Sequence, residues 1–447
     1  MLIDTGLLQS GSSDRYTLHQ TIADYARLHL TGDGAQKRLV SFLRAFVKEH
    51  SLDYETLEME RNNLLAALAV SFEMALSADL IEIICAFAPF LLARGLYEMA
   101  ETDLRRALTA AQALADPGEM RVLLFLGEMV QRRGSFVQAE RYYLEGLARA
   151  RQRQANDQAM FLSNLGSLSW KQGKYADADS YLQEGLLLAR TDGQEYLYTI
   201  LEALSSVAQR RGEYLASEKY AREALALYTV SPEREEAHLS NLLSTLGIAL
   251  LGQQRLLEAG HVFQEGLDLA RRTGHREWTV NLLNNLGDLK KNQGEYLQAK
   301  VYLQEGLELA RNLGHVEWTC VLLVTCGETA RRQGWFEQAE VYLQEGIDLA
   351  QQVGIPQMTA LALSEQGHIA LLAGDLVRAE HCFEKMRGSL PDGDRELLSW
   401  MQYGLAQLAS AQGNTKEARH LAEVALAHKT LSTEPAIRQW LASLPLE

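Results

Sequence analysis

One position recurs along the chain at almost constant intervals, and this period constrains the fold more than any other feature of the sequence. It holds a glycine in eight units and a glutamine in one: Gly95, Gly134, Gly173, Gly212, Gln254, Gly294, Gly334, Gly374 and Gly413. Successive positions are 39 to 42 residues apart. A fixed period of this length is typical of stacked repeats rather than of independent domains.

Each unit is predicted to be a helical hairpin. Around Gly294, leucines recur at helical spacing before the glycine (Leu282, Leu286) and after it (Leu303, Leu307). Glycine ends a helix readily because it adopts the left-handed conformation that a tight turn needs. We therefore expect a helix A, a turn at the recurring position, and a helix B in every unit.

Two further glycine columns lie inside the predicted helices. Seven residues before the turn stand Gly127, Gly166, Gly247, Gly287, Gly327 and Gly367. Twelve residues after it stand Gly146, Gly185, Gly266, Gly306 and Gly346. A glycine inside a helix costs about 1 kcal/mol relative to alanine. A chain that repeats this cost is expected to recover it by packing helices A and B very closely.

The set Leu286, Gly287, Gly294, Ala299 and Gly306 resembles the tetratricopeptide repeat (TPR), a helix-turn-helix unit that stacks into a superhelix. The resemblance implies an all-α fold, a right-handed α-solenoid of about nine TPR-like repeats of ~40 residues. The array is predicted to cover residues 79–428. Its period is longer than the 34 residues usual in that family.

The first 33 residues differ from the array. Their phrase RYTLHQ, followed by Tyr25 and Ala26, resembles the end of a winged-helix module in bacterial signal-transduction ATPases of the STAND class, in their NB-ARC-like branch. The resemblance implies that residues 1–33 are the remnant of such a module, joined upstream to an ATPase, and that His19 contacts the nucleotide. Gln20 stands where that family usually has aspartate. The alternative is a short lead-in with no such role.

The two ends of the array are expected to be covered by helices. Residues 34–78 lack the glycine columns and are predicted to form a helical N-terminal cap. Residues 429–447 are predicted to contain a C-terminal capping helix, because TEPAIRQWLASL has a helical apolar pattern. Such caps cover the apolar faces that terminal repeats would otherwise expose.

The composition excludes several classes of function. The formal net charge is −15, which argues against direct binding of nucleic acid or an anionic membrane. Four cysteines without paired spacing predict free thiols in a reducing cytoplasm and no metal site. The stretch GSLSWKQGKY resembles a phosphate loop, but its glycines belong to the repeat columns. No catalytic motif is present, so we expect no enzyme and no cofactor in this chain; ATP or ADP would bind only an upstream ATPase domain.

Two groups of polar residues leave alternatives open. His275 and His315 recur in the phrase GHxEW, where packing against Trp278 and Trp318 at a helix start explains them better than catalysis. Basic clusters end several A helices, at 131–133, 209–211, 290–292 and 331–333. They either complement the helix dipoles or form a ridge for an acidic partner.

The predicted partner site lies on the inner face of three A helices. Its residues are Asn241, Ser244, Thr245, Asn281, Asn284, Asn285, Asp288, Lys291, Val321, Thr325, Glu328 and Arg331. Asparagine is a poor helix former, so three in one helix require a reason. Amides along a groove can bind the backbone of an extended peptide. The alternative is that they bond to adjacent helices and stiffen the array.

The sequence thus predicts a non-catalytic, cytoplasmic sensor domain of a bacterial signal-transduction ATPase or transcriptional regulator. Its concave groove would bind an inducer, a protein or a peptide. The alternative is a stand-alone TPR scaffold that mediates protein–protein interactions without a nucleotide switch.

Overall fold

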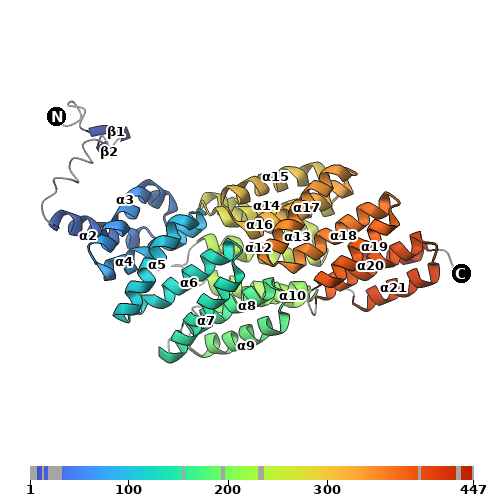
Figure 1. Cartoon of the computed structure of the whole chain (residues 1–447), viewed down its shortest axis with the longest axis horizontal. Coiled ribbons are helices and arrows are strands. Elements are labelled where there is room, and N and C mark those ends of the chain that lie inside the picture. The colour runs from blue at the N-terminus through green and yellow to red at the C-terminus, as the bar shows by residue number, and fades with distance from the viewer. Residues whose placement is uncertain are drawn as a thin grey trace.

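The computed structural model describes residues 8–12, 15–18, 33–153, 157–192, 197–229, 236–390, 394–428 and 434–444. Within these residues, twenty-one α-helices follow one short antiparallel hairpin, in which β1 (Leu8–Ser12) pairs with β2 (Arg15–Leu18). Figure 1 shows the helices as consecutive hairpins along an elongated array. His19, Tyr25 and Ala26 of the predicted winged-helix remnant lie outside the described residues.

The predicted all-α array of nine helix-turn-helix repeats is confirmed. The A helices are α4 (Ser77–Ala93), α6 (Gly118–Arg132), α8 (Gln158–Lys171), α10 (Leu197–Arg210), α12 (Glu236–Gly252), α14 (Arg276–Asn292), α16 (Val316–Arg332), α18 (Pro356–Leu372) and α20 (Arg395–Ala411). The B helices are α5 (Tyr97–Leu114), α7 (Phe136–Arg153), α9 (Tyr175–Asp192), α11 (Tyr214–Thr229), α13 (Leu256–Arg272), α15 (Tyr296–Asn312), α17 (Phe336–Val353), α19 (Leu376–Ser389) and α21 (Thr415–Ala427). Each A helix packs on its own B helix, and each B helix packs on the next A helix. We number these repeats 1 to 9.

The recurring turn position has the same backbone conformation in every repeat. All eight turn glycines have positive φ, and Gln254 joins them with φ 63°. At Gly294 the amide nitrogen donates to Lys291 O at 3.0 Å, and the nitrogen of Glu295 donates to Lys290 O at 2.9 Å. The turn therefore ends helix A with the backbone bonding that a left-handed residue allows.

The glycines inside the helices receive side chains from neighbouring helices. A Cβ added to Gly247 would lie 2.3 Å from the ring of Phe263 on helix B of the same repeat. In the second column, a Cβ on Gly146 would lie 2.2 Å from the ring of Phe161 on the next helix A. The close packing expected from these columns is present, and Gly247 and Gly146 each make room for one large apolar side chain.

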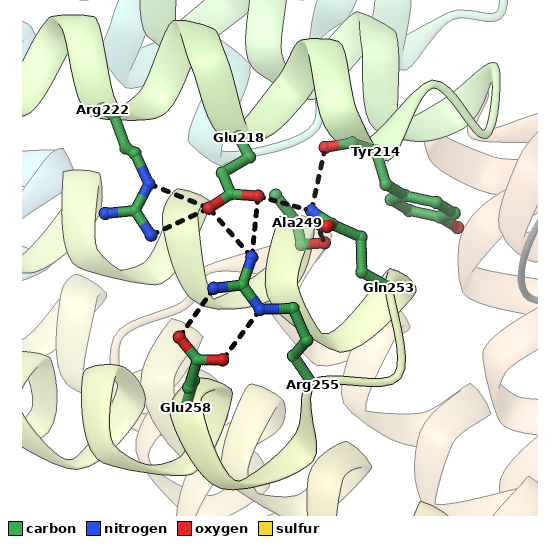
Figure 2. A network of polar contacts seen from close by, with 7 residues as sticks. All are labelled: Tyr214, Glu218, Arg222, Ala249, Gln253, Arg255 and Glu258. Atoms are coloured by element: carbon green, nitrogen blue, oxygen red, sulfur yellow. Dashed lines mark hydrogen bonds and ion pairs between the residues drawn. The ribbon is translucent and has the colours of Figure 1, made fainter.

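The junction between repeats 4 and 5, where glutamine replaces the turn glycine, carries a surface network of polar contacts. Figure 2 shows the guanidinium group of Arg255 between the carboxylates of Glu218 and Glu258. Glu218 also accepts from Arg222 Nε at 2.8 Å and from Gln253 Nε2 at 2.9 Å. Although burial opposes it, these hydrogen bonds hold the pKa of Glu218 below its usual value. The network ties α11 to α13 across the junction.

Additional helices lie at both ends of the array. At the N-terminal end, α2 (Gly34–Glu49) and α3 (Tyr54–Glu73) pack on each other and on α4. At the C-terminal end, α22 (Glu434–Ser443) packs on α21 and buries Ile437 completely. In the described part of the chain, no helix has the length and apolarity needed to cross a membrane. All four cysteines are free thiols and are buried.

Candidate functional site

The A helices form the inner layer of the solenoid. Successive A helices from α8 to α20 touch each other directly, whereas successive B helices of the repeats make at most isolated contacts. In a curved stack of two layers, the layer whose members approach each other is the concave one. The side chains that bridge neighbouring A helices therefore lie on the concave face of the stack, which we call the channel.

The centre of the channel is a polar cluster on α12 and α14. Ser244 Oγ donates to Asn281 Oδ1 at 2.6 Å, and Asn285 Nδ2 donates to the same oxygen at 2.7 Å. Asn285 Nδ2 also donates to Ser244 Oγ at 2.8 Å. Three predicted site residues thus lie together and satisfy one another across two repeats. Ser244 and Asn285 are buried and Asn281 is half-buried.

On the N-terminal side of this cluster, the next predicted residues contact repeat 4. Asn241 Nδ2 donates to the carboxylate of Glu202 on α10. Thr245 makes two hydrogen bonds. Its hydroxyl donates to Asn241 O at 3.0 Å, and its backbone carbonyl accepts from Gln209 Nε2 at 3.1 Å. Burial raises the pKa of Glu202 to about 7, against the effects of Asn241 and Lys171. Glu202 is a functional candidate that our sequence analysis did not select.

On the C-terminal side, the charged predicted residues are paired across repeats. Lys291 Nζ contacts both Asp288 and Glu328, and Arg331 contacts Glu365 on α18. Lys291 is only 5% exposed. Burial opposes its charge, but the two carboxylates outweigh burial and raise the pKa of Lys291. These pairs link α14 to α16 and α16 to α18.

Among the remaining predicted residues, Asn284 differs from the rest. Val321 and Thr325 are half-buried on α16, and the Thr325 hydroxyl donates to Val321 O at 3.0 Å. Asn284 is 9% exposed, and its Oδ1 is buried without any hydrogen-bond partner. An unsatisfied buried carbonyl oxygen costs about 1–3 kcal/mol. Asn284 therefore has an unused acceptor in the polar wall of the channel.

The superhelix also closes on itself. Repeats 1 to 3, in the first superhelical turn, meet the second superhelical turn along a line of contacts that we call the seam. One side of the seam is made by Arg94, Arg132 and Lys171, and the other side by Gly274, Glu277 and Glu317. Arg132 Nε lies 2.8 Å from Glu277 Oε2, and Lys171 Nζ lies 2.8 Å from Glu317 Oε2. In Figure 1, repeats 2 and 3 accordingly lie opposite repeats 6 and 7.

The two recurring histidines sit beside the seam as helix caps. The Nδ1 atoms of His275 and His315 accept from the backbone nitrogens of Trp278 and Trp318, each at 3.4 Å. The His275 ring stacks on Trp278 with 5.0 Å between centroids. The predicted role at the helix start is confirmed. Burial lowers the pKa of His275 to about 3, so this imidazole is neutral.

The basic clusters at the ends of the A helices have partners within the chain. Arg132 binds the carboxylate of Glu277 in repeat 6. Arg331 binds Glu365 of the next repeat, and Arg332 binds Glu328 of its own repeat. A ridge that binds an external acidic partner would have to break such pairs. These observations favour a structural role for the clusters.

The seam was not predicted from the sequence. The acidic residues Glu277 and Glu317 occupy the second position of their A helices, and Arg132 and Lys171 occupy the second position before their turn glycines. This complementarity is a visible signal. It does not say which repeats face each other, because that depends on the small rotation accumulated at every repeat.

Comparisons with known proteins agree with this architecture. Two sequence profiles, each described as tetratricopeptide repeat, match the chain: one over residues 238–312 and 278–352, the other over residues 159–191. No curated protein matches the sequence significantly. Tetratricopeptide arrays present extended concave surfaces that serve as protein-binding scaffolds.

Several solved structures resemble the solenoid. A Rap protein complexed with competence and sporulation factor has a TM-score of 0.57 at 14% identity, covering 81% of this chain and 98% of that chain. A signal-transduction ATPase with a tetratricopeptide repeat sensor, from Pyrococcus horikoshii, has a TM-score of 0.46 at 15% identity, covering 96% of this chain and 67% of that chain. Aspartyl phosphate phosphatase F from Bacillus subtilis has a TM-score of 0.47 at 14% identity, covering 82% and 96%.

At these identities the Rap structure supports the fold alone. The periodic turns, the glycine columns and the profile matches agree on one family of repeats. Residues 159–191 and 238–352 carry tetratricopeptide repeats, and the helix pairs on either side continue them as one all-α, TPR-like solenoid.

Proposed function

We propose that this solenoid is a non-catalytic sensor domain that binds an extended protein segment or peptide in the channel of repeats 5 to 7. The observation that carries the proposal is the unpartnered Oδ1 of Asn284, next to the hydrogen-bonded cluster of Ser244, Asn281 and Asn285. The oxygen is buried, so a peptide N–H would give it its missing hydrogen bond once the side chains that cover it move aside. The neighbouring residues hold each other in place, which lowers the entropic cost of binding.

The surrounding residues suit binding better than catalysis. Lys291 and Arg332 together balance the charges of Asp288 and Glu328, and Ser244 is held by two asparagines. A catalytic nucleophile or base needs a reactive group that is free to meet the substrate. We infer that the channel recognises its ligand without chemical conversion and without a cofactor of its own.

We further infer that the array regulates an ATPase or transcription module joined to it in a bacterial cytoplasm. The support is the phrase around Arg15 and Tyr16 that resembles the junction in STAND-class ATPases, with His19 as the nucleotide contact. The buried free cysteines suit a reducing compartment. The gene sequence upstream of Met1 tests this inference: a GxxxxGK[ST] loop supports it, and an immediately upstream stop codon contradicts it.

The channel is tested with a pooled library of ten-residue peptides selected on the immobilised full chain. Selected peptides should bind the Asn284→Ala variant about 5- to 10-fold more weakly, the loss expected for one hydrogen bond. The matched control is Asn292→Ala, an exposed asparagine on the same helix whose side chain contacts only Asp288. Equal affinity for both variants, or no selected peptide at all, contradicts the proposal.

We further expect that Asn284, Asn285 and Lys291 of the predicted site bind the ligand together. The variants that test this expectation have to keep the charges of the site balanced. Lys291→Ala would remove the cation that Asp288 and Glu328 share and would leave Glu328 paired with Arg332 alone. The double variant Lys291→Met with Glu328→Gln removes one cation and one carboxylate together, so the net charge of the site does not change. Circular dichroism first confirms helical content, and peptide binding by the same variant is then compared with that of the wild type.

A further inference from the structure

The seam repeats one contact at two successive repeats. Arg132 and Glu277 are 145 residues apart, and Lys171 and Glu317 are 146 residues apart. Each pair joins the end of an A helix to the start of the A helix four repeats later. Because the same cation–carboxylate contact recurs with the period of the array, it is part of the superhelical design and not a chance encounter of two surface charges.

Close apolar packing accompanies the ion pairs of the seam at the turn glycines of repeats 1 and 2. A Cβ on Gly95 would lie 2.7 Å from Leu313 Cδ2, and a Cβ on Gly134 would lie 2.5 Å from Val353 Cγ1. By contrast, a Cβ on Gly294 or on Gly334 would meet nothing within 4 Å. The turn glycines of repeats 1 and 2 therefore permit close approach as well as a left-handed turn, whereas those of repeats 6 to 9 serve the turn alone.

The ion pairs of the seam favour two discrete states. Glu277 is 9% exposed and Arg132 is 17% exposed, while Lys171 and Glu317 are 23% and 17% exposed. Such poorly hydrated charges are stable when they are paired, or when separation is wide enough for water to surround both. A partial separation leaves each charge neither paired nor hydrated. Packed interfaces of this type switch between arrangements and do not stretch continuously.

We propose that the seam is a latch: it holds the superhelix in a closed turn, and its release opens the channel between the first-turn and second-turn A helices. The seam links α6 and α8 to α14 and α16, and α14 carries Asn281, Asn284 and Asn285. Release of the latch therefore frees that wall from the opposite side of the turn. The inference that release of the latch admits a partner rests on the proposed function. The inference that the seam holds the superhelix closed does not.

Charge reversal of one pair tests the latch in the full chain. Lys171→Glu and Glu317→Lys each place like charges across the seam, and the double variant restores opposite charges. Each single variant should increase the radius of gyration measured by small-angle X-ray scattering, and the double variant should return it toward the wild-type value. The matched control is Glu345→Lys, which breaks the 2.6 Å pair with Arg311 between the outer helices of neighbouring repeats. This control should leave the radius unchanged.

A second measurement keeps the test decisive if a reversal variant folds poorly. Ser135 and Gln352 are exposed residues on opposite sides of the seam, next to Gly134 and Val353, whose contact closes it. Spin labels on cysteines introduced at both positions should give one short distance in an otherwise wild-type chain, because the four native thiols are buried. The milder variant Glu317→Gln should add a population at longer distance.

Two outcomes overturn the latch. One is an unchanged radius and label distance in every seam variant. The other is an opened chain that the double reversal fails to close. Neither measurement uses a ligand, so failure of the latch is distinguishable from failure of the peptide site. With a selected peptide available, Glu317→Lys should raise its association rate, whereas Glu345→Lys should match the wild type.

Discussion

Arg132 and Glu277 come from repeats 2 and 6 and form an ion pair with 2.8 Å between Nε and Oε2. Burial would raise the pKa of Glu277, but Arg132 outweighs it, and His315 adds a further favourable contact. The pKa of Glu277 is therefore held well below its usual range. Removing Arg132 would leave the carboxylates of Glu277 and Glu128 without the cation that both contact. The relationship makes two distant repeats dependent on each other.

The first prediction concerns two glycines that occupy different columns. Gly247→Ala places a Cβ 2.3 Å from the ring of Phe263 and should destabilise the protein by about 1–3 kcal/mol through overpacking. Gly346→Ala meets Val324 Cγ2 at 3.3 Å and nothing closer. It should stabilise the protein by up to about 1 kcal/mol, because alanine is the better helix former. Thermal unfolding of both variants checks the opposite signs; equal shifts would show that helix propensity alone controls these sites.

The second prediction is a pH dependence that arises from Glu202. Its folded-state pKa of about 7 is above the ordinary value of 4.5, so the folded protein binds this proton more tightly than the unfolded chain. Its contribution to stability is fully present below pH 4.5 and is lost as the pH rises to about 7. Because Glu202→Gln has no carboxyl group to ionise, its free energy of unfolding should exceed that of the wild type by on the order of 1–3 kcal/mol above pH 7.

Urea unfolding at several pH values between 4 and 8 measures this gain. The difference between variant and wild type should grow across the window and then remain constant. Glu308→Gln, on the exposed surface of α15, controls for the loss of one carboxylate. A constant difference at all pH values contradicts the assignment.

The third prediction is that the native thiols resist modification. Burial raises the pKa of the Cys85 thiol to about 11 and those of Cys320 and Cys326 to about 12. The reactive thiolate is therefore scarce at pH 8. A chromogenic disulfide reagent should react slowly with the folded protein and with four thiols after denaturation in guanidinium. Rapid stoichiometric reaction of the folded protein is the contrary result.

The fourth prediction concerns the network of Figure 2. Glu218 accepts hydrogen bonds from Arg222, Arg255 and Gln253 and is 14% exposed. Glu218→Ala should destabilise the junction of repeats 4 and 5 by about 1–2 kcal/mol, because it removes the shared acceptor of three donors. Hydrogen exchange of the amides in α12 measures the local effect.

The control for that variant lies on the same helix. Glu223 is 38% exposed and meets Arg190 at 3.6 Å, which is a weak surface pair. Glu223→Ala should change stability by less than about 0.5 kcal/mol. Similar exchange rates in the two variants would show that the network of Glu218 adds nothing beyond an ordinary surface charge.

Much of the fold was predictable because it depends on local rules. The turn at Gln254 was placed by period alone, and its φ of 63° confirms that the stack enforces a left-handed residue even without glycine. The columns of Gly247 and Gly146 likewise predicted close packing. The identity of the side chains that enter these gaps, Phe263 and Phe161, followed only from the structure.

The candidate site was predictable in position but not in bonding. Helical register places Asn281 and Asn285 on one face, and the structure joins them through Ser244 of the preceding repeat. That bond depends on the distance between neighbouring A helices, which a single sequence does not specify. The polar partner of Asn241, Glu202, also comes from another repeat. The role of these residues in partner binding stays a prediction.

The seam fixes the number of repeats between its two halves, although the architecture is otherwise modular. A solenoid stabilised only by neighbouring repeats tolerates the gain or loss of a unit in its middle. Here, deletion of one repeat between the two halves of the seam would bring Arg132 opposite Glu317, but Lys171 opposite Gln357, the residue at the corresponding position of α18. One of the two ion pairs would be lost. In homologous chains that keep both pairs, the number of repeats between them should be invariant.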